Sequence, residues 1–380
     1  MKKQTIQLLV LAMISAATIG CSQQKKVQEI DYSLIPYALC QDGGCFMGYI
    51  DTQGNPVILP QFEDGWAFSD ELAIVRKNGL CGFINKEGAF VIPAIYDNAA
   101  MFFDERAFVH EPGQPITCIN TNGETVFELT DCIEAGFFSE GLAPVCNASK
   151  KWGYVNTAGE QVIAAQFDEA YCFAEGCARV KLGKLYGFIN PNGQFIINPQ
   201  YGEANDFSCG LAAVRGTEYR ADWKYINKEG KCVLTNDRYV NINFSEDLMC
   251  NWESRHHMVI RNVQGDSLAA TQAFDAVGPF SEGLCAVTLA KSSGFIDKTG
   301  LLVINPIYDN TGHFHEGVAI IKQNGKYGLV DKKGQLVVEP KYDFIGSAPH
   351  FRPQVNEGLV KNTMREFWCK LDISKKRRNR

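Results

Sequence analysis

The sequence predicts an all-β protein built from nine tandem units of about 35 residues. Three observations predict this: a turn of the form Asp/Asn-x-x-Gly recurs, short aromatic and β-branched runs flank it, and a Phe-Ser-Glu-Gly segment follows in most units. So regular a period indicates one supersecondary unit stacked repeatedly, because a single unit cannot bury its own apolar face. The last glycines of the nine turns, 34 to 37 residues apart, are Gly54, Gly88, Gly123, Gly159, Gly193, Gly230, Gly265, Gly300 and Gly334.

The first two elements of a unit form a hairpin. Tyr186–Ile189 is an aromatic and β-branched run that favours a strand. Asn190–Gly193 is typical of a type I turn that ends on a left-handed glycine, and Phe195–Ile197 returns as the second strand. We expect Pro199 to stop that strand.

The first position of the turn is Asp or Asn in all nine units, which is expected of a side chain that caps the turn. The middle positions vary freely, as solvent-facing tips should. Examples are Asp51–Gly54, Asn85–Gly88, Asn156–Gly159, Asp297–Gly300 and Asp331–Gly334.

A third strand follows, entered by a turn that usually contains glycine. Its sequence is Phe-Ser-Glu-Gly-Leu-Ala at Phe138–Ala143 and ends in Cys at Phe280–Cys285. Alternating apolar residues after this turn are typical of a strand. Between hairpin and third strand lies an aromatic–acid pair, in which we interpret the ring as a core residue between units and the carboxylate as a cap for the following turn. The pairs are Tyr96-Asp97, Phe167-Asp168, Phe274-Asp275, Tyr308-Asp309 and Tyr342-Asp343.

These residues resemble the WG-repeat (KWG-repeat) family of bacterial proteins. Lys151–Gly159 carries the signature, and Tyr186–Ile189, Cys81–Ile84 and Tyr327–Val330 repeat it with the Trp replaced. The resemblance covers residues 40–345, although the glycine is missing in some units, for example at Thr117 and Lys224. It implies an all-β repeat with a binding role and no assigned chemistry, so it supplies no active-site residues.

Two closures of the array compete. An open, superhelical solenoid leaves end units that residues 27–46 and 346–380 would cap. A closed β-propeller has no ends but usually has four strands per blade and four to eight blades. Three strands and nine units favour the solenoid. The predicted organisation is a signal peptide (1–20), a lipidated N-terminus and tether (21–39), nine repeats (40–345), and a C-terminal cap with a basic tail (346–380).

The N-terminus resembles a bacterial lipoprotein signal. Lys2 and Lys3 precede an apolar stretch too short to span a bilayer, and small residues lead to Cys21. We therefore expect diacylglyceryl modification of Cys21, which would anchor the chain to a membrane of the cell envelope. The alternative is an ordinary signal peptide with an accidental Cys. The body would lie in the periplasm or at the cell surface, and the absence of an acidic run after Cys21 favours the periplasm.

The charge argues against a nucleic-acid partner. Residues 1–20 carry two lysines and no acid, so their removal moves the net charge from −6 to −8, whereas nucleic-acid binding needs a basic face. The basic tail 375–380 has no interleaved aromatic residues, and we interpret it as a solvated terminus.

Thirteen cysteines follow Cys21, and no Cys-x-x-Cys pair suggests a metal site. Cys81, Cys177 and Cys285 occupy apolar positions of the repeat, which predicts mostly buried free thiols. One or two disulfides remain compatible with the spacing, at Cys40/Cys45 and Cys172/Cys177.

We find no motif for catalysis, a metal or a cofactor. His313 and His315 would share a strand face, but no third ligand follows in the sequence. Glycosidases need two facing acids, yet Glu140 and Asp168 belong to sets that recur with the repeat, as structural caps do. The chain is therefore predicted not to be an enzyme.

Two functions remain open. The first is a protein-interaction scaffold that binds an envelope protein, and the alternative is a glycan- or cell-wall-binding module with a ladder of exposed aromatic rings. The repeat is most disturbed around residues 236–265, so Trp252, Arg255 and His256 are a candidate binding surface.

Overall fold

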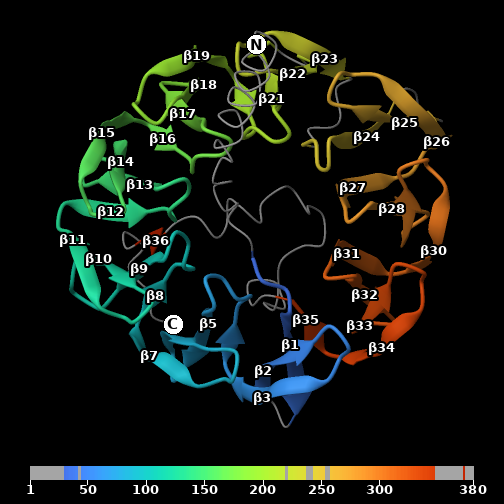
Figure 1. Cartoon of the computed structure of the whole chain (residues 1–380), viewed down its shortest axis with the longest axis horizontal. Coiled ribbons are helices and arrows are strands. Elements are labelled where there is room, and N and C mark those ends of the chain that lie inside the picture. The colour runs from blue at the N-terminus through green and yellow to red at the C-terminus, as the bar shows by residue number, and fades with distance from the viewer. Residues whose placement is uncertain are drawn as a thin grey trace, which may run out of the picture.

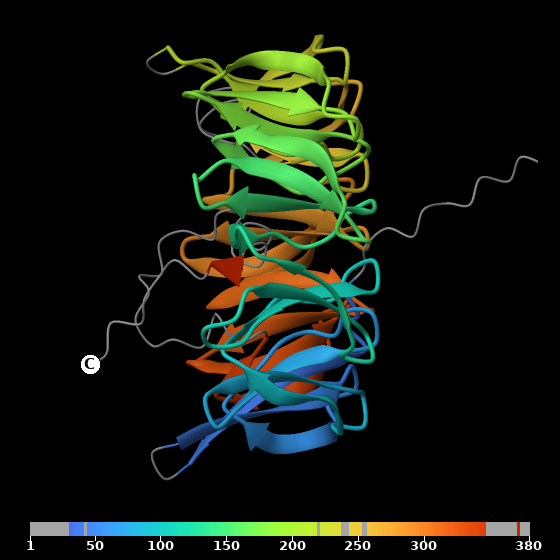
Figure 2. The ribbon, with the colours of Figure 1, turned by 90° about the vertical axis from the view of Figure 1, so that its left-hand side faces the viewer.

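The nine units form a closed nine-bladed β-propeller in a computed structural model (Figure 1). The structure describes residues 30–41, 44–218, 221–236, 243–252, 257–346 and 371–372, and these contain strands but no helix. Accordingly, none of them forms a helix that would cross a membrane. The predicted all-β repeat is confirmed. The preferred open solenoid was wrong and the alternative, a closed propeller, is correct. Figure 2 shows the ring from its edge.

Each blade is a small antiparallel sheet. In most blades the strands follow sequence order from the channel to the rim, whereas the innermost strands of the sheets in blades 1 and 4 come from the C-terminal part of the described chain. Blades 1 to 3 contain β35 (Phe344–Ile345), β1 (Leu34–Gln41), β2 (Gly44–Asp51), β3 (Pro56–Phe62); β4 (Asp64–Gly65), β5 (Ala73–Lys77), β6 (Leu80–Ile84), β7 (Phe90–Tyr96); and β8 (Asn98–Ala99), β9 (Arg106–His110), β10 (Ile116–Asn120), β11 (Thr125–Leu129). Blades 4 to 6 contain β12 (Cys132–Ala135), β13 (Leu142–Asn147), β14 (Trp152–Asn156), β15 (Gln161–Phe167); β16 (Glu169–Ala170), β17 (Ala178–Leu182), β18 (Leu185–Ile189), β19 (Phe195–Tyr201); and β20 (Glu203–Ala204), β21 (Ala212–Arg215), β22 (Trp223–Ile226), β23 (Cys232–Asn236). Blades 7 to 9 contain β24 (Leu248–Trp252), β25 (His257–Asn262), β26 (Ser267–Gln272); β27 (Ala276–Ser281), β28 (Leu284–Leu289), β29 (Ser292–Asp297), β30 (Leu302–Tyr308); and β31 (Asn310–His315), β32 (Val318–Gln323), β33 (Lys326–Asp331), β34 (Leu336–Tyr342).

The sequence missed the innermost strand of the blades, which has six residues in blades 8 and 9 and is absent from the described residues of blade 7. In five blades it has two residues, too few to show an alternating pattern. The innermost strand of blade 1 comes from the other end of the array: β35 pairs with β1 through Tyr37↔Ile345 and Ala38↔Phe344. This pairing closes the ring, so no end unit needs the caps predicted at 27–46 and 346–380. Beyond residue 346 the structure describes only β36 (Leu371–Asp372), which pairs with β12.

The core lies between neighbouring blades. The aromatic residue of the aromatic–acid pair is buried, as predicted, in blades 2, 4, 7, 8 and 9, and so are the signature residues Trp152 and Tyr154. Edge-to-face contacts join the rings, as between Phe295 and Phe314 at 4.7 Å. The aromatic residues of the pair and of the signature therefore pack between neighbouring blades.

The signature position must be glycine because the adjacent strand leaves no room for a side chain. A Cβ atom on Gly153 would lie 2.5 Å from the carbonyl oxygen of Ile163 on the adjacent strand. That strand bulges towards the glycine: Trp152 pairs with Phe167 and Tyr154 with Ile163, which leaves three residues opposite one. The same contact and bulge occur at Gly48, Gly82, Gly187, Gly294 and Gly328.

Blades without the glycine lack this bulge. Thr117 and Lys224 sit in continuous register with Glu128 and Thr235 of their outer strands. The predicted strand end at Pro199 was wrong, because β19 continues through it to Tyr201. Pro199 lies in the bulge of an outermost strand, where a residue without an N–H is tolerated.

The Asp/Asn-x-x-Gly turns are capped as predicted. The Asn190 Oδ1 atom accepts hydrogen bonds from the backbone N–H groups of Asn192 (3.1 Å) and Gln194 (3.0 Å). Gly193 adopts φ = 79°, the left-handed conformation that the turn needs. These outer turns lie on the same side of the ring as the inner turns, which join the first and second strands, because strand direction alternates. We call this side the turn face and the opposite side the linker face.

Candidate functional site

The inner turns form a chain of hydrogen bonds on the turn face. The serine of the Phe-Ser-Glu-Gly motif donates from Oγ to the carbonyl of the motif phenylalanine in the next blade, as Ser245 does to Phe280 at 2.7 Å. Ser139 and Ser281 make the same contact with Phe173 and Phe314. The repeated serine therefore couples blade to blade.

The motif carboxylate makes a second inter-blade contact. Glu175 accepts from the backbone N–H of Gly210 at 2.9 Å, and Glu282 accepts from that of Gly317 at 3.0 Å. Burial raises the pKa of Glu282, but Lys332 and the Gly317 N–H outweigh burial, so the net pKa is lowered. Glu140 contacts Gly176 in the same way. The interpretation of these acids as structural, and not as a catalytic pair, agrees with this geometry.

The acid of the aromatic–acid pair caps a turn on the linker face. Asp168 accepts from the Gly183 N–H at 2.6 Å, and Asp275 accepts from the Ala290 N–H at 2.7 Å. These turns join the second and third strands of a blade. The carboxylate is therefore a cap, but the prediction that it caps the turn directly following it in the chain was wrong, because the turn that it reaches lies one strand further on.

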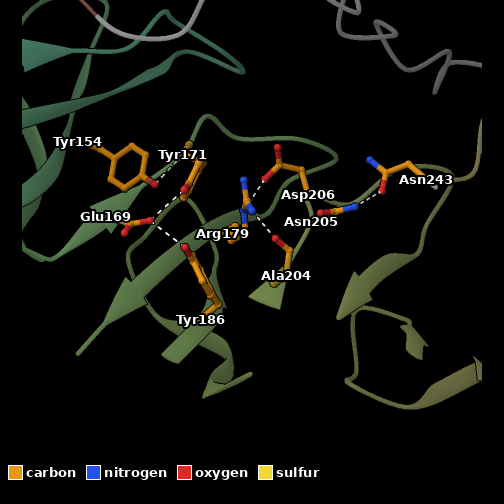
Figure 3. A network of polar contacts seen from close by, with 9 residues as sticks. All are labelled: Tyr154, Glu169, Tyr171, Arg179, Tyr186, Ala204, Asn205, Asp206 and Asn243. Atoms are coloured by element: carbon orange, nitrogen blue, oxygen red, sulfur yellow. Dashed lines mark hydrogen bonds and ion pairs between the residues drawn. The ribbon is translucent and has the colours of Figure 1, made fainter. Parts of the chain in front are cut away.

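A polar cluster around Arg179 is the main departure from the repeat (Figure 3). Arg179 is the one charged residue among the buried side chains of the described part of the chain. Its guanidinium lies 3.7 Å from the ring centroid of Tyr171, its Nε is 3.2 Å from the Asp206 carboxylate, and it donates to the Ala204 carbonyl. Since Asp206 and Ala204 belong to blade 6, the arginine joins blades 5 and 6 near the channel.

Glu169 forms the other half of the cluster. Its carboxylate accepts hydrogen bonds from Tyr171 (2.9 Å), Tyr186 (2.9 Å) and Lys181 (2.7 Å). Burial raises the pKa of Glu169, but these three donors outweigh burial and lower it. Tyr154 of blade 4 donates to the Tyr171 carbonyl at 2.8 Å, which extends the cluster across a third blade.

The cluster can position half-buried polar groups but has no group arranged as a nucleophile and base. Asn205 donates to the Asn243 side chain at 3.0 Å, so the polar strip continues towards blade 7. Arg179 was not predicted from the sequence. A position-by-position alignment of the units would have found it, because the corresponding residues are apolar: Ile74, Phe108, Pro144, Ala213, Cys250, Ala286 and Ile320.

Comparison with protein families agrees with the glycine geometry. A family model described as a WG containing repeat matches residues 47–81, 82–110, 116–150, 152–186, 186–215, 294–327 and 327–348, which is more than half of the chain. The chain belongs to the WG-repeat family. The units that the model does not match lie in blades 6 to 8, which include two of the three blades without the signature glycine.

Among curated proteins nothing matches the WG-repeat chain. Solved structures with some similarity include BamB from Moraxella catarrhalis (12% identity, 70% of this chain and 96% of that chain, TM-score 0.42). Others are Hsv2p from Kluyveromyces lactis (10%, 64% and 96%, TM-score 0.38) and the WD40 β-propeller domain of Doa1 (11%, 60% and 93%, TM-score 0.29). These scores are low, and the propeller fold of the WG-repeat chain follows from its own sheets.

The two histidines of β31 pack against different neighbours. The ring of His313 packs over Gly278, where an added Cβ would lie 2.9 Å from its Cε1 atom. His315 stacks on Tyr32 with ring centroids 4.0 Å apart. Burial lowers the pKa of both imidazoles. Among the described residues, no group of three His, Cys, Asp or Glu side chains is arranged to hold a metal ion.

Two of the predicted sites lie mostly outside the described residues. The backbone of Trp252 ends β24 and pairs with Met258, whereas Arg255 and His256 are not described. Cys21 likewise lies outside the described part of the chain.

The cysteines of the WG-repeat ring are mostly free. Cys40 and Cys45 form a disulfide across the β1–β2 hairpin, as their spacing allowed, whereas Cys172 and Cys177 are unbridged. Six of the ten free cysteines in the described residues are buried, in agreement with their use as small apolar side chains.

The rim of the ring exposes aliphatic side chains. Residues of the outermost strands and their turns are the most exposed, with Leu59 and Leu301 both at 67%. Leu301 and Leu302 border a hollow of about 320 Å³ between blades 7 and 8, whose other wall includes Thr271 and Phe274. Further exposed apolar residues on the outer strands of blades 7 and 8 are Leu268, Val303 and Ile307.

Proposed function

We propose that the chain is a cell-envelope lipoprotein without a catalytic site, whose WG-repeat propeller is a protein-interaction scaffold. The observation that carries the proposal is that the repeated polar and aromatic motif residues are used inside the ring. Their serines, carboxylates and rings join one blade to the next. Groups that join neighbouring blades stabilise the ring and are not available to a partner. A partner would therefore bind to the exposed surfaces of the ring.

The exposed surfaces favour a protein partner. Leu301 and Leu302 border the hollow between blades 7 and 8, Leu268 and Ile307 are exposed on the outer strands of the same blades, and groups of exposed apolar side chains are typical of protein interaction sites. A sugar-binding ladder would need exposed aromatic rings. Every Tyr and Trp whose side chain is described is buried or half-buried, and the exposed rings in the described residues are Phe46, Phe90 and Phe195, which lie in three different blades; glycan binding is therefore the less favoured alternative.

The membrane anchor is tested separately. We expect Cys21 of the exported chain to carry a diacylglyceryl group, detectable as an added mass on the N-terminal peptide and as partitioning into detergent. A Cys21→Ala variant should be released from the membrane fraction. Recovery of wild-type protein in the soluble envelope fraction, without lipid, would contradict the anchor.

Substitutions on the rim test whether the ring binds an envelope protein. Envelope proteins cross-linked to the ring should be identified, purified and bound again in solution. If the rim of blade 8 is the contact, Leu301→Glu should weaken that binding tenfold or more, because a buried leucine contributes about 1.5–3 kcal/mol. Leu59→Glu, equally exposed in blade 1, is the matched control. Saturable binding to purified cell-wall glycans instead of a protein would overturn the proposal.

A further inference from the structure

The outer strand of blade 7 is an unprotected sheet edge. β26 pairs with β25 on one side, and in the described part of the chain no strand pairs with its other side. The pairing is regular from Ile260↔Ala269 to His257↔Gln272, without the bulge that bends the outer strands opposite a signature glycine. A flat edge leaves a row of backbone N–H and C=O groups available to another extended chain.

Most other blades protect the same edge. Six have the bulge in their described strands, and five of these also carry a proline in it, which cannot donate a hydrogen bond to an added strand. In blade 3 the outer strand carries the exposed charge of Glu128, which also opposes pairing. β26 has the sequence Ser-Leu-Ala-Ala-Thr-Gln, with neither proline nor charge. The five prolines are Pro60, Pro93, Pro199, Pro306 and Pro340.

A large side chain is missing beside this edge. In the described part of the ring, eight blades place a large apolar side chain of the outer strand against the outer-turn glycine of the next blade, as Ile304 lies against Gly334. In blade 7 the corresponding residue is Ala269, and Thr271 lies closest to Gly300 instead. The hollow of about 320 Å³ between blades 7 and 8 lies at this place. β23 of blade 6 also lacks proline and charge, but there Leu234 fills the position.

The charges around the edge define the segment that fits it. Neither β26 nor Leu301–Tyr308, on the rim of blade 8, contains a charged residue. Exposed carboxylates, those of Asp266 and Asp275, lie beyond the two ends of β26. An uncharged centre between two acids complements a segment that is apolar in its middle and basic at its ends.

We propose that β26 is the docking edge for an extended segment of a protein partner, which adds a strand to blade 7 and inserts a large apolar side chain into the hollow. The inference rests on the proposed protein-interaction function and names the kind of segment that the ring binds. An added strand lies about 4.8 Å beyond β26, next to Leu301 and Leu302, which border the hollow. Main-chain hydrogen bonds then supply affinity, and the hollow supplies specificity.

Selection from random peptides tests the edge on the purified protein. Peptides of about ten residues, long enough to span β26, are displayed on their mRNA and selected against the immobilised protein. Enriched sequences are synthesised with a fluorescent label, and their affinity is measured by anisotropy. We expect large apolar residues at alternate central positions and Lys or Arg at the ends. Failure to enrich any peptide, or enrichment of charged centres, would overturn the proposal.

Methylation of the peptide backbone separates strand pairing from side-chain docking. In a paired strand only every second N–H points towards β26. N-methyl groups on one alternate set of residues should therefore weaken binding about tenfold or more, and those on the other set should have little effect. Hydrogen exchange within Ser267–Gln272 should slow when the peptide binds. Equal effects of the two methylated sets, or protection elsewhere in the ring, contradicts edge pairing.

Two substitutions test β26 itself. Ala270→Lys adds a charge to the exposed edge, and Thr271→Ile fills the hollow, so each should weaken peptide binding about tenfold or more. The matched control is Asn198→Lys, at an exposed position of the bulged strand β19, which should leave the affinity unchanged. Circular dichroism checks the fold of each variant, and if one does not fold, the other and the methylated peptides still decide. Unchanged affinity in a folded variant of both kinds excludes β26.

Sedimentation distinguishes a partner segment from a second copy of the chain. The protein should be monomeric at the concentrations used for binding. A dimer that Ala270→Lys dissociates would assign the edge to a second copy and overturn the proposal.

The peptide test is independent of the search for an envelope partner. If no envelope protein cross-links to the ring, the proposed scaffold fails, whereas binding of peptides to β26 is still measured. If an envelope protein binds wild type and Ala270→Lys equally well, the scaffold stands and the docking edge fails.

Discussion

At the scale of single residues, the signature glycine shows how one missing side chain shapes a blade. Gly153 adopts an ordinary strand conformation, so its role does not depend on backbone freedom. Instead, the bulged strand β15 approaches so closely that a Cβ would overlap the Ile163 carbonyl. Blades with Thr117 or Lys224 at this position keep a regular register, which shows that glycine and bulge occur together.

We predict that Gly153→Ala destabilises the ring by about 1–3 kcal/mol, because the new methyl group must displace the backbone of β15. Gly312→Ala is the control. A Cβ there meets its nearest neighbour at 3.7 Å, an ordinary contact, so the change should stay within about 1 kcal/mol. Urea unfolding followed by circular dichroism measures both. Equal stabilities of the two variants would refute the spatial explanation.

The aspartates that cap the outer turns predict that the stability of the fold depends on pH. In Asp51 and Asp297 burial raises the pKa, but hydrogen bonds from the turn outweigh it and lower the pKa in the folded state. A lowered folded pKa stabilises the protein above the unfolded pKa of about 3.9, and this contribution is lost as the pH falls through the folded value. Asn makes the same cap without titrating, as in Asn190.

The double variant Asp51→Asn, Asp297→Asn should therefore match wild type at pH 7 and lose less stability between pH 5 and pH 3. Melting temperatures across this range test the expectation. Parallel curves for the two proteins would show that these carboxylates do not contribute to acid unfolding.

At the scale of elements, most blades are coupled to the next by a carboxylate of the inner turn, and several also by its serine, whereas blade 6 uses Cys209 in place of the carboxylate. Both contacts reach backbone groups, so they tolerate variation in the neighbouring side chains. Where the serine is replaced, other contacts take over, for example Phe103 packing on Phe137 at 4.6 Å. The motif is therefore a connector between blades, and its recurrence reflects the number of blade junctions.

We expect Ser139→Ala and Ser281→Ala each to cost about 1 kcal/mol, since each leaves a carbonyl of the next blade without its partner. Because blades 4 and 8 share no contacts, the double variant should cost the sum. Exposed Ser149→Ala is the control and should be neutral. Chemical denaturation gives all four values, and a neutral Ser139→Ala would exclude a stabilising role for the hydrogen bond.

At the scale of the whole molecule, the ring is closed in blade 1 by two separate segments. β35 supplies the innermost strand, with Phe344 packed against Tyr327 at 5.5 Å. Just before β1, the Asp31 N–H donates to the Phe68 carbonyl of blade 2, and Tyr32 stacks on His315 of blade 9. Both ends of the array are thus tied to the same blade. Closure of this kind removes the exposed sheet face that an open array would leave at each end.

Ending the chain at residue 342 should open the ring, because β1 then loses its inner partner. We expect a larger radius of gyration in small-angle scattering and faster hydrogen exchange at Tyr37 and Ala38. A chain ending at residue 346, which retains β35, is the control and should resemble the full-length protein. An unchanged radius for the shorter chain would show that β35 does not close the ring.

The sequence by itself determined the repeat, its number of units, the turns and the all-β class, because these depend on local preferences of Asp, Asn, Gly and β-branched residues. It also indicated the buried aromatic positions and the structural nature of the repeated acids. The tertiary structure alone decided the closure, the fourth strand and the Arg179 cluster. Closure depends on the rotation between successive blades and on two-residue pairings such as Tyr37↔Ile345, which leave no periodic pattern in the chain. Residues as distant in sequence as Tyr32 and His315 meet only when the ring is complete.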